Sequence, residues 1–152
     1  MPKNIFLIIP VFLIIFIVYR VFFYSPELKK NIFKIKDQEY KLEIAITLAQ
    51  KEHGLMNRPS LCQNCGMIFV STIEMPQIYW MKNTLIPLDI IFLDKNGQVI
   101  NIATAVPEPN VADSRLKLYK SDRNAKYIIE LNAGDSDKIG LKSGDIIGFS
   151  GL

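Results

Sequence analysis

The chain has 152 residues, of which 49% are hydrophobic, and its 18 Lys and Arg residues stand against 15 Asp and Glu. This length is typical of one domain with an appendage. Two of the basic residues fall within residues 1–24, so residues 25–152 carry 16 basic against 15 acidic side chains, a net charge of +1. A balance this even excludes a strongly basic polyanion-binding surface, and we expect no nucleic-acid partner.

The amino-terminal segment is strongly apolar. Residues 5–19 contain no charged side chain, and the apolar stretch continues to Tyr24 if Arg20 extends its guanidinium to the membrane surface. Twenty residues of helix rise about 30 Å, which is enough to cross a bilayer core. The run is longer than the apolar region of a signal peptide, and no small-x-small cleavage site follows it. Residues 1–24 are therefore predicted to be an uncleaved anchor that binds the membrane through residues 5–24, with a cleaved signal peptide as the alternative.

Charge does not decide the orientation of this anchor. Lys3 and the amino terminus lie on one side, and Arg20, Lys29 and Lys30 lie on the other, so the positive-inside rule gives no clear answer. A very short tail before a single span most often stays in the cytoplasm. We therefore expect a single-pass protein of the cytoplasmic membrane with its globular domain outside the cytoplasm. The alternative is a cytoplasmic domain held by a reversed anchor.

A linker over residues 25–31 is predicted to lead into a compact domain over residues 32–152. Apolar and polar residues alternate over 32–36 and again over 40–46, which indicates a first β-hairpin around residues 37–39.

A short helix is predicted directly after this hairpin. Thr47 and Gln50 have the spacing of a capping box, and Gly54 is suited to a C-cap, so the helix should cover residues 48–53.

The chain has two cysteines, Cys62 and Cys65, at the spacing of redox dithiols and of half a zinc site. A redox motif needs its first cysteine at a helix N-terminus, but Cys65 leads through Gly66 into an apolar strand. A structural zinc needs about four ligands, and only His53 lies nearby. Outside the cytoplasm we expect a disulfide between the two cysteines, with redox chemistry and metal binding as alternatives.

Further strands are predicted over residues 66–71, 77–81 and 88–94. The sequence Asp94-Lys95-Asn96-Gly97 is a strong hairpin signal and leads into a strand over residues 98–104.

The last third of the chain begins with a long excursion. Residues 105–125 contain two prolines and seven charged side chains, and long loops in compact domains are often functional. A strand over 126–131, a short helix over 135–139 and a final strand after a turn at Ser143-Gly144 should follow. The predicted fold is mostly β (α+β), an antiparallel sheet curled toward a small barrel with one or two short helices, preceded by the transmembrane helix.

Five segments resemble, in order and spacing, the domain of unknown function 192 family: Gly54-Leu55-Met56-Asn57-Arg58, Gly66-Met67-Ile68-Phe69, Trp80 to Asp94, Tyr127 to Gly134, and Gly140 to Ile146. The resemblance covers roughly residues 33–150. It implies a small β-rich domain, frequently exported or membrane-tethered in bacteria and archaea, without an established biochemical activity. The chain departs from the family pattern at Asn57, where Phe is usual, and at its Cys pair, which lies in a segment that is commonly acidic and cysteine-free.

The candidate binding site is a polar cluster between two apolar runs. Trp80 precedes Lys82, Asn83 and Thr84, and Asp89 follows in apolar surroundings. The side chains and backbone amides of residues 82–84 can hold a carboxylate, phosphate or carbonyl group, while Asp89 can orient Lys82 or bind a cation.

With one arginine added, the predicted ligand-binding set is Arg58, Trp80, Lys82, Asn83, Thr84 and Asp89. The alternative is structural: Asn83 and Thr84 make turn hydrogen bonds, and Asp89 pairs with Lys82 or Arg58. For Glu130 too, a functional and a structural role are both open. It lies on the side of an alternating strand opposite to Tyr127, Ile129 and Leu131, and it either faces a site or points to solvent.

The sequence contains no catalytic signature that names a reaction, because the single His53 cannot be paired with a Ser or Cys in a recognisable motif. We expect no cofactor and no metal, since methionines in apolar strands are core residues more often than copper ligands. The favoured function is a monomeric, membrane-anchored extracytoplasmic binding or accessory module, with an unidentified small-molecule or protein ligand. The alternative is an enzyme, or a thiol-redox or metal-handling protein, that uses Cys62 and Cys65 or the cluster over residues 82–89.

Overall fold

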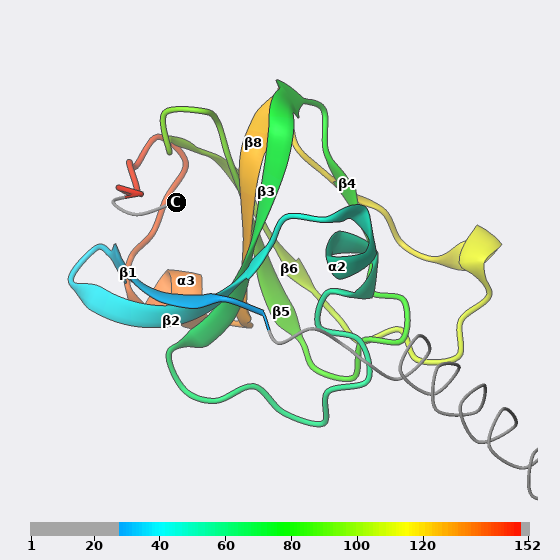
Figure 1. The fold of residues 1–152 in the computed structure, drawn as a ribbon. Helices are drawn as coiled ribbons and strands as arrows, with labels where there is room; N and C mark the ends of the chain where they lie inside the picture. Colours follow the sequence, from blue (N-terminus) through cyan, green and yellow to red (C-terminus); the bar gives the residue numbers. More distant parts are fainter. Residues whose placement is uncertain (1–27, 150–152) are drawn as a thin grey trace, which may run out of the picture.

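The computed structural model describes residues 28–149 of the chain (Figure 1). The anchor predicted over residues 1–24 lies outside these described residues, and no helix within 28–149 is long and apolar enough to span a membrane. The elements follow in the order β1 (Lys30–Ile35), β2 (Gln38–Ala45), α2 (Leu48–His53), β3 (Cys65–Met75), β4 (Ile78–Tyr79), β5 (Leu88–Leu93), β6 (Val99–Ala105), the 3₁₀ helix η1 (Asp113–Arg115), β7 (Tyr119–Lys120), β8 (Ala125–Asn132) and α3 (Asp135–Lys138).

The main sheet has six strands in the order β1-β2-β3-β8-β5-β6, and β4 pairs with β7 in a separate ribbon. β2 and β3 are parallel, and every other neighbouring pair is antiparallel. The prediction of a mostly β fold with two short helices is confirmed, but the antiparallel sheet curled toward a barrel is wrong. Within the described chain the sheet is mixed, and β1 and β6 are its open edges.

The parallel pair has a simple cause. Residues 46–64 carry the chain out through α2 and back to the middle of β2, so that Cys65 at the start of β3 pairs with Lys41. Parallel neighbours require a crossover of a dozen or more residues, and this segment supplies one. Hairpin patterns in the sequence do not show that a strand returns by such a route.

The first hairpin and the first helix form as their local sequence predicts. β1 pairs with β2 around a turn at Lys36, whose φ is 55°, although β1 begins at Lys30, inside the predicted linker. The Thr47 hydroxyl accepts a hydrogen bond from the Gln50 backbone N–H at 3.3 Å, and the Gln50 side chain accepts one from Thr47 N–H at 3.0 Å. This capping box begins α2, and Gly54 ends it.

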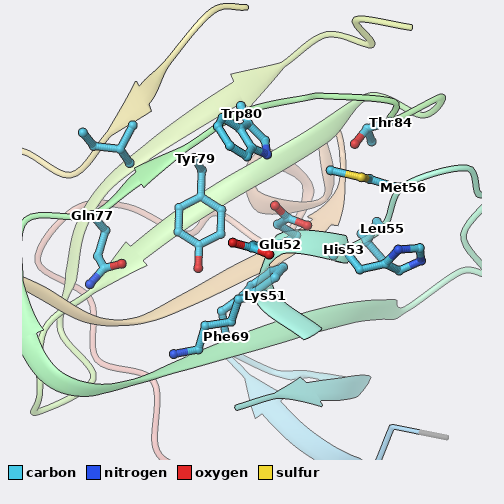
Figure 2. A pocket seen from close by; sticks show the side chains of 13 residues that line it. Lys51, Glu52, His53, Leu55, Met56, Phe69, Gln77, Tyr79, Trp80 and Thr84 are labelled. Carbon is cyan, nitrogen blue, oxygen red and sulfur yellow. The ribbon is translucent and has the colours of Figure 1, made fainter. Parts of the chain in front are cut away.

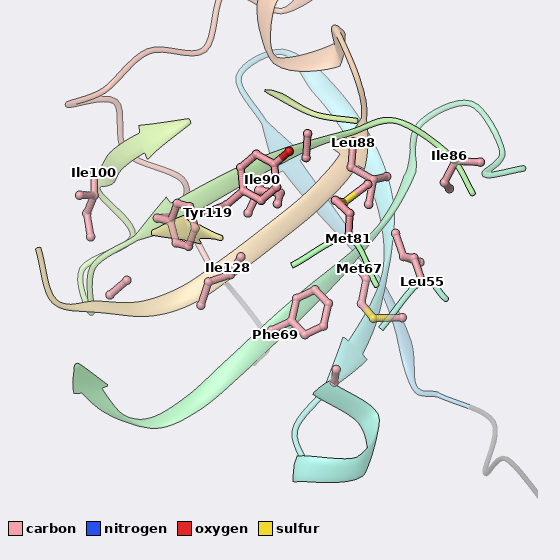
Figure 3. Packing of buried hydrophobic residues seen from close by; sticks show 14 residues of the cluster. Leu55, Met67, Phe69, Met81, Ile86, Leu88, Ile90, Ile100, Tyr119 and Ile128 are labelled. Atoms are coloured by element: carbon pink, nitrogen blue, oxygen red, sulfur yellow. The ribbon is translucent and has the colours of Figure 1, made fainter. Parts of the chain in front are cut away.

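Both faces of the sheet are covered, so the central strands are buried on both sides. All six residues of β5 are buried. The first core lies on the face toward α2 and the β4–β7 ribbon (Figure 3) and contains Ala45, Leu55, Met67, Phe69, Met81, Ile86, Leu88, Ile90, Phe92, Ile100, Ala105, Tyr119, Ala125 and Ile128. The second core includes the C-terminal segment and contains Phe33, Ile35, Tyr40, Leu42, Ile44, Ile68, Ile91, Leu93, Val99, Ile129, Leu131, Leu141 and Ile147.

The C-terminal end differs from its prediction. The turn over residues 94–97 forms, with Gly97 at a φ of 79°. The predicted final strand is reduced to an isolated bridge between Gln98 and Ile146, and the Ile147 N–H donates to the Gly97 carbonyl at 2.9 Å. The excursion over 105–125 contains η1 and β7, and β7 forms one half of the two-stranded ribbon.

Candidate functional site

A pocket of about 250 Å³ opens on the face of the first core (Figure 2). It is smaller than the usual range of ligand pockets, about 300–1,000 Å³, so it suits a small molecule or one group of a larger one. We call it the Glu130 pocket. Figure 2 shows Tyr79 and Trp80 across the pocket from the α2 residues, and the complete lining is Lys51, Glu52, His53, Gly54, Leu55, Met56, Phe69, Gln77, Ile78, Tyr79, Trp80, Thr84 and Glu130.

Glu130 is the buried acid of this pocket. It lies on β8, in register with Met67 of β3 and Ile90 of β5, and only 5% of its surface is exposed. Among residues 28–149, no side chain or backbone group forms a hydrogen bond or ion pair with its carboxyl group. Burial raises the pKa of Glu130 to about 8, while the charge of Arg58 acts in the opposite direction. The carboxyl is therefore mostly protonated at neutral pH.

Aromatic packing fixes the wall next to Glu130. The Tyr79 ring meets Phe69 edge-on at a centroid distance of 5.1 Å and Phe92 at 6.0 Å. Burial, followed by the nearby Glu130 carboxyl, raises the pKa of Tyr79 well above its ordinary value. Trp80 is 43% exposed at the rim. The buried Thr84 hydroxyl donates to the Lys82 carbonyl at 3.3 Å and also lines the pocket.

The structure divides the cluster predicted over residues 82–89. Trp80 and Thr84 line the Glu130 pocket, but Lys82 turns to η1, where its ammonium group lies 2.6 Å from the Asp113 carboxylate. Asn83 is exposed in a left-handed turn with a φ of 51°, and its carbonyl accepts the Asn57 N–H at 2.9 Å. These contacts place Lys82 and Asn83 outside the pocket lining.

Asp89 lies on the opposite face of the sheet. Successive residues of a strand face opposite sides, so Asp89 shares the side of Ile91 in the second core. Asp89 as a residue is 1% exposed, and its carboxylate accepts hydrogen bonds from the Thr104 hydroxyl at 3.0 Å, Gly134 N–H at 2.9 Å and Ser136 N–H at 3.0 Å, as well as from the Ser136 hydroxyl. Asp89 therefore fixes the first turn of α3, and the structural alternative in which Asp89 pairs with Lys82 or Arg58 is wrong.

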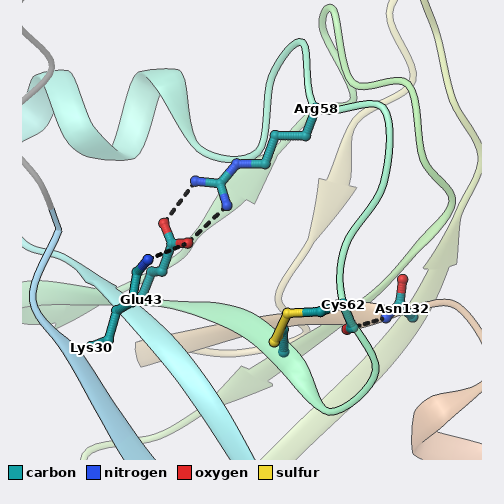
Figure 4. The surroundings of a disulfide bond; sticks show 6 residues. Lys30, Glu43, Arg58, Cys62 and Asn132 are labelled. Carbon is teal, nitrogen blue, oxygen red and sulfur yellow. Dashed lines mark hydrogen bonds and ion pairs between the residues drawn. A yellow bond between two sulfur atoms is a disulfide. The ribbon is translucent and has the colours of Figure 1, made fainter.

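Arg58 is engaged by a different carboxylate (Figure 4). Its guanidinium makes two hydrogen bonds to Glu43 of β2, at 2.8 and 2.7 Å, and Lys30 lies 3.8 Å from the same carboxylate. The hydrogen bond from Arg58 is the main reason that the pKa of Glu43 is lowered. This bidentate pair holds the segment after α2 against β2, and Arg58 does not line the pocket.

Cys62 and Cys65 form a disulfide in the structure (Figure 4). The Asn132 side-chain amide donates to the Cys62 carbonyl at 3.1 Å and so ties this loop to the end of β8. Cys65 starts a strand rather than a helix, so no helix N-terminus is present to activate a thiol. Within residues 28–149, no group of three or more His, Cys, Asp or Glu side chains is arranged to hold a metal ion.

Sequence reasoning did not assign Tyr79 to the site and left Glu130 undecided. The available signal was the run Ile128-Ile129-Glu130-Leu131, which is nearly continuous in apolar residues and is typical of a strand buried on both faces. Such a strand has no solvent side, so its acid must lie either in a core or in a pocket.

Comparison with known proteins places the fold in a family. Residues 31–149 match DUF192, described as "Uncharacterized ACR". A UPF0127 protein of Thermococcus sibiricus (strain DSM 12597 / MM 739) is 29% identical over 109 residues, which cover 70% of this chain and 64%, less than two thirds, of that relative.

Two solved structures are similar. One is a Sinorhizobium meliloti 1021 protein described as a candidate transcription regulator, with 28% identity, a TM-score of 0.70, and coverage of 82% of this chain and 97% of that chain. The other is a protein of unknown function from Novosphingobium aromaticivorans DSM 12444, with 30% identity, a TM-score of 0.68, and coverage of 80% and 85%. Because the family pattern extends over nearly the whole described domain, the chain belongs to the uncharacterised DUF192 family.

Proposed function

We propose that this domain is a binding module for a small polar molecule, and that the Glu130 pocket is its site. The observation that carries the proposal is that Glu130, a residue only 5% exposed, lines a pocket, and that its carboxyl group has no hydrogen-bond or ion-pair partner within residues 28–149. Burying a carboxyl group without a hydrogen-bond partner costs free energy. A ligand that bonds to Glu130 would recover part of that cost.

The rest of the lining supports this function. Ligand sites combine apolar and aromatic walls with a few polar groups that fix orientation. Phe69, Tyr79 and Trp80 supply the walls, and Thr84 and Glu130 supply polar groups. Of the residues predicted from sequence to bind a ligand, Trp80 and Thr84 remain in this proposal, while Arg58, Lys82, Asn83 and Asp89 have structural partners of their own.

The proposal can be tested by screening a fragment library against the full chain in mild detergent by NMR. Binding fragments should shift the resonances of Tyr79, Trp80 and Glu130, and Glu130→Gln should weaken them. Glu39→Gln removes the same charge at an exposed position of β2 and should have no effect. If fragments shift only residues outside the pocket, or if Glu39→Gln and Glu130→Gln behave alike, the pocket is not the site.

We also propose that residues 1–24 anchor the domain in the cytoplasmic membrane and that the domain lies outside the cytoplasm as a monomer without a nucleic-acid partner. The apolar sequence supports the anchor, and the disulfide supports an oxidising compartment. Protease added to intact spheroplasts should digest the domain. A domain that survives until the membrane is lysed would reverse this topology.

A second candidate function is acid–base catalysis by Glu130. Catalytic groups are often carboxyls whose pKa is brought near neutrality by burial, and the pKa of Glu130 is raised to about 8. The two functions differ in an observable way, because a catalyst converts its ligand and a binding module returns it unchanged. NMR spectra of each fragment hit, collected over a day of incubation, would distinguish them.

A further inference from the structure

Glu130 has a carboxyl group but no cation bound to it. Its neighbours in register on both sides, Met67 and Ile90, are apolar. Arg58 is the cation whose charge acts on the carboxyl, and its guanidinium is held by two hydrogen bonds to Glu43. The fold therefore pairs the Arg58 guanidinium with a different acid and leaves the carboxyl group of the pocket unpaired within the described chain.

The other ionisable groups that face the pocket come from α2 and β4. Lys51, Glu52 and His53 lie on α2, and Tyr79 lies on β4. Lys51 makes no salt bridge within residues 28–149, and Glu52 offsets its charge at the same rim. An anionic ligand would thus be repelled by the Glu52 and Glu130 carboxylates and could pair only with the Lys51 ammonium group, whereas a cationic ligand could pair with either carboxylate.

Three aromatic side chains line the same pocket: Phe69, Tyr79 and Trp80. Alkylammonium and methylammonium groups are stabilised over aromatic faces as well as by carboxylates, and the gain is larger where water is excluded. Phosphate and carboxylate ligands gain nothing comparable from such walls. The combination of rings with an unpaired carboxyl group therefore favours one class of ligand.

We propose that the Glu130 pocket binds a small organic cation, a primary or methylated amine, whose ammonium group pairs with the Glu130 carboxylate. This inference rests on the binding function proposed above and names the ligand class. Binding replaces a proton: the neutral carboxylic acid releases H⁺ to solvent and becomes the carboxylate that holds the cation.

The replacement makes affinity depend on pH. Glu130 holds its proton up to about pH 8, and a site that is only fractionally in its binding-competent form loses affinity by that fraction. The apparent Kd for an amine that stays protonated should therefore rise about tenfold for each unit by which the pH is lowered below the pKa of Glu130, and should level off above that pKa. Neutral and anionic ligands should not show this slope.

The experiment is a titration of the full chain in mild detergent with methylammonium, ethanolammonium and tetramethylammonium chlorides. Sodium acetate and glycerol serve as the anionic and neutral probes. Binding is followed through Trp80 fluorescence and through the ¹³C resonance of the Glu130 carboxyl group, at pH values from about 6 to 9 so that the tenfold steps are resolved. We expect at least one amine to bind with this slope, and the Glu130 carboxyl to titrate at lower pH when that amine is saturating.

Two variants and two contrary outcomes complete the test. Glu130→Gln, whose fold is checked by circular dichroism, should abolish amine binding, and Glu39→Gln should leave both the affinity and its slope unchanged. If acetate or glycerol binds in the pocket and the amines do not, the cation inference is overturned while the binding function stands. If neither these probes nor the fragment library shifts Glu130, Tyr79 or Trp80, the binding function fails as well.

Discussion

Glu130 should make the stability of the domain fall as pH rises. The folded chain binds the Glu130 proton up to about pH 8, whereas an unfolded chain releases it near the ordinary glutamate pKa of 4.5. Between these values the folded state holds more protons than the unfolded state, so raising the pH favours unfolding. The stabilising effect of the proton is complete below pH 4.5 and is lost as the pH passes through 8.

The magnitude follows from the same two values. Each pH unit in this range costs about 1.4 kcal/mol, so wild-type chain should lose roughly 3–4 kcal/mol of unfolding free energy between about pH 5 and pH 8. Glu43 acts in the opposite direction and at lower pH, because its pKa is lowered, mainly by Arg58, and its contribution is lost as the pH falls. The two effects therefore occupy different parts of the pH range.

The assay is thermal and urea unfolding of wild type and Glu130→Gln, followed by circular dichroism at intervals across this range. All other ionisable groups are common to both proteins, so the difference between the two curves isolates Glu130. Glu130→Gln should be nearly as stable as wild type at the acidic end and more stable at the basic end, and Glu39→Gln should follow wild type throughout. Parallel curves for wild type and Glu130→Gln would refute the assignment of a buried, unpaired carboxyl group.

Three further predictions test the framework around the pocket. Asp89→Ala leaves the hydrogen-bond donors of Thr104 and of the first turn of α3 without an acceptor, so it should lower the free energy of unfolding by roughly 3–5 kcal/mol, measured by urea unfolding. Asp89→Asn should lower it less. An unchanged urea midpoint for Asp89→Ala would exclude a structural role for Asp89. Gly66→Ala would drive a Cβ into the Glu130 carbonyl oxygen and the Leu131 side chain, so it should cost about 2–3 kcal/mol and shift the Glu130 resonances. Replacing Cys62 and Cys65 together with serine should leave the fold intact in circular dichroism, because so short a loop restrains little unfolded-chain entropy; loss of the folded spectrum would contradict this.

Local features of this fold could be predicted from sequence because their causes are local. Thr47, Gln50 and Gly54 specify both ends of α2, and the structure has the predicted bounds, Leu48–His53. The turn at Gly97 and the strand that follows it are likewise encoded within a few residues. The parallel pairing of β2 and β3 depends instead on where residues 46–64 return to the sheet, and no short pattern records it.

The structure separates the residues of the predicted site where their grouping depended on which side of a strand a residue faces. Lys82 and Asp89 are close in sequence and were grouped for that reason. The loop before β5 and the alternation along β5 send them to different partners, Asp113 and the first turn of α3. Trp80 and Thr84 were retained because both lie on the side of the first core, next to the pocket.

The position of Glu130 connects the fold to the proposed function. On a sheet with one solvent face, an acid within an alternating strand points to water and needs no explanation. Here β8 is the fourth of six strands, and both faces of the sheet carry a core. An acid in that position faces a burial cost whichever side it takes, and the cost is greatest when no cation or donor meets it. Selection for stability alone would favour an apolar residue between Met67 and Ile90. That an unpaired carboxyl group occupies this position, and lines a pocket with three aromatic rings, is the strongest physical reason to look for a ligand there.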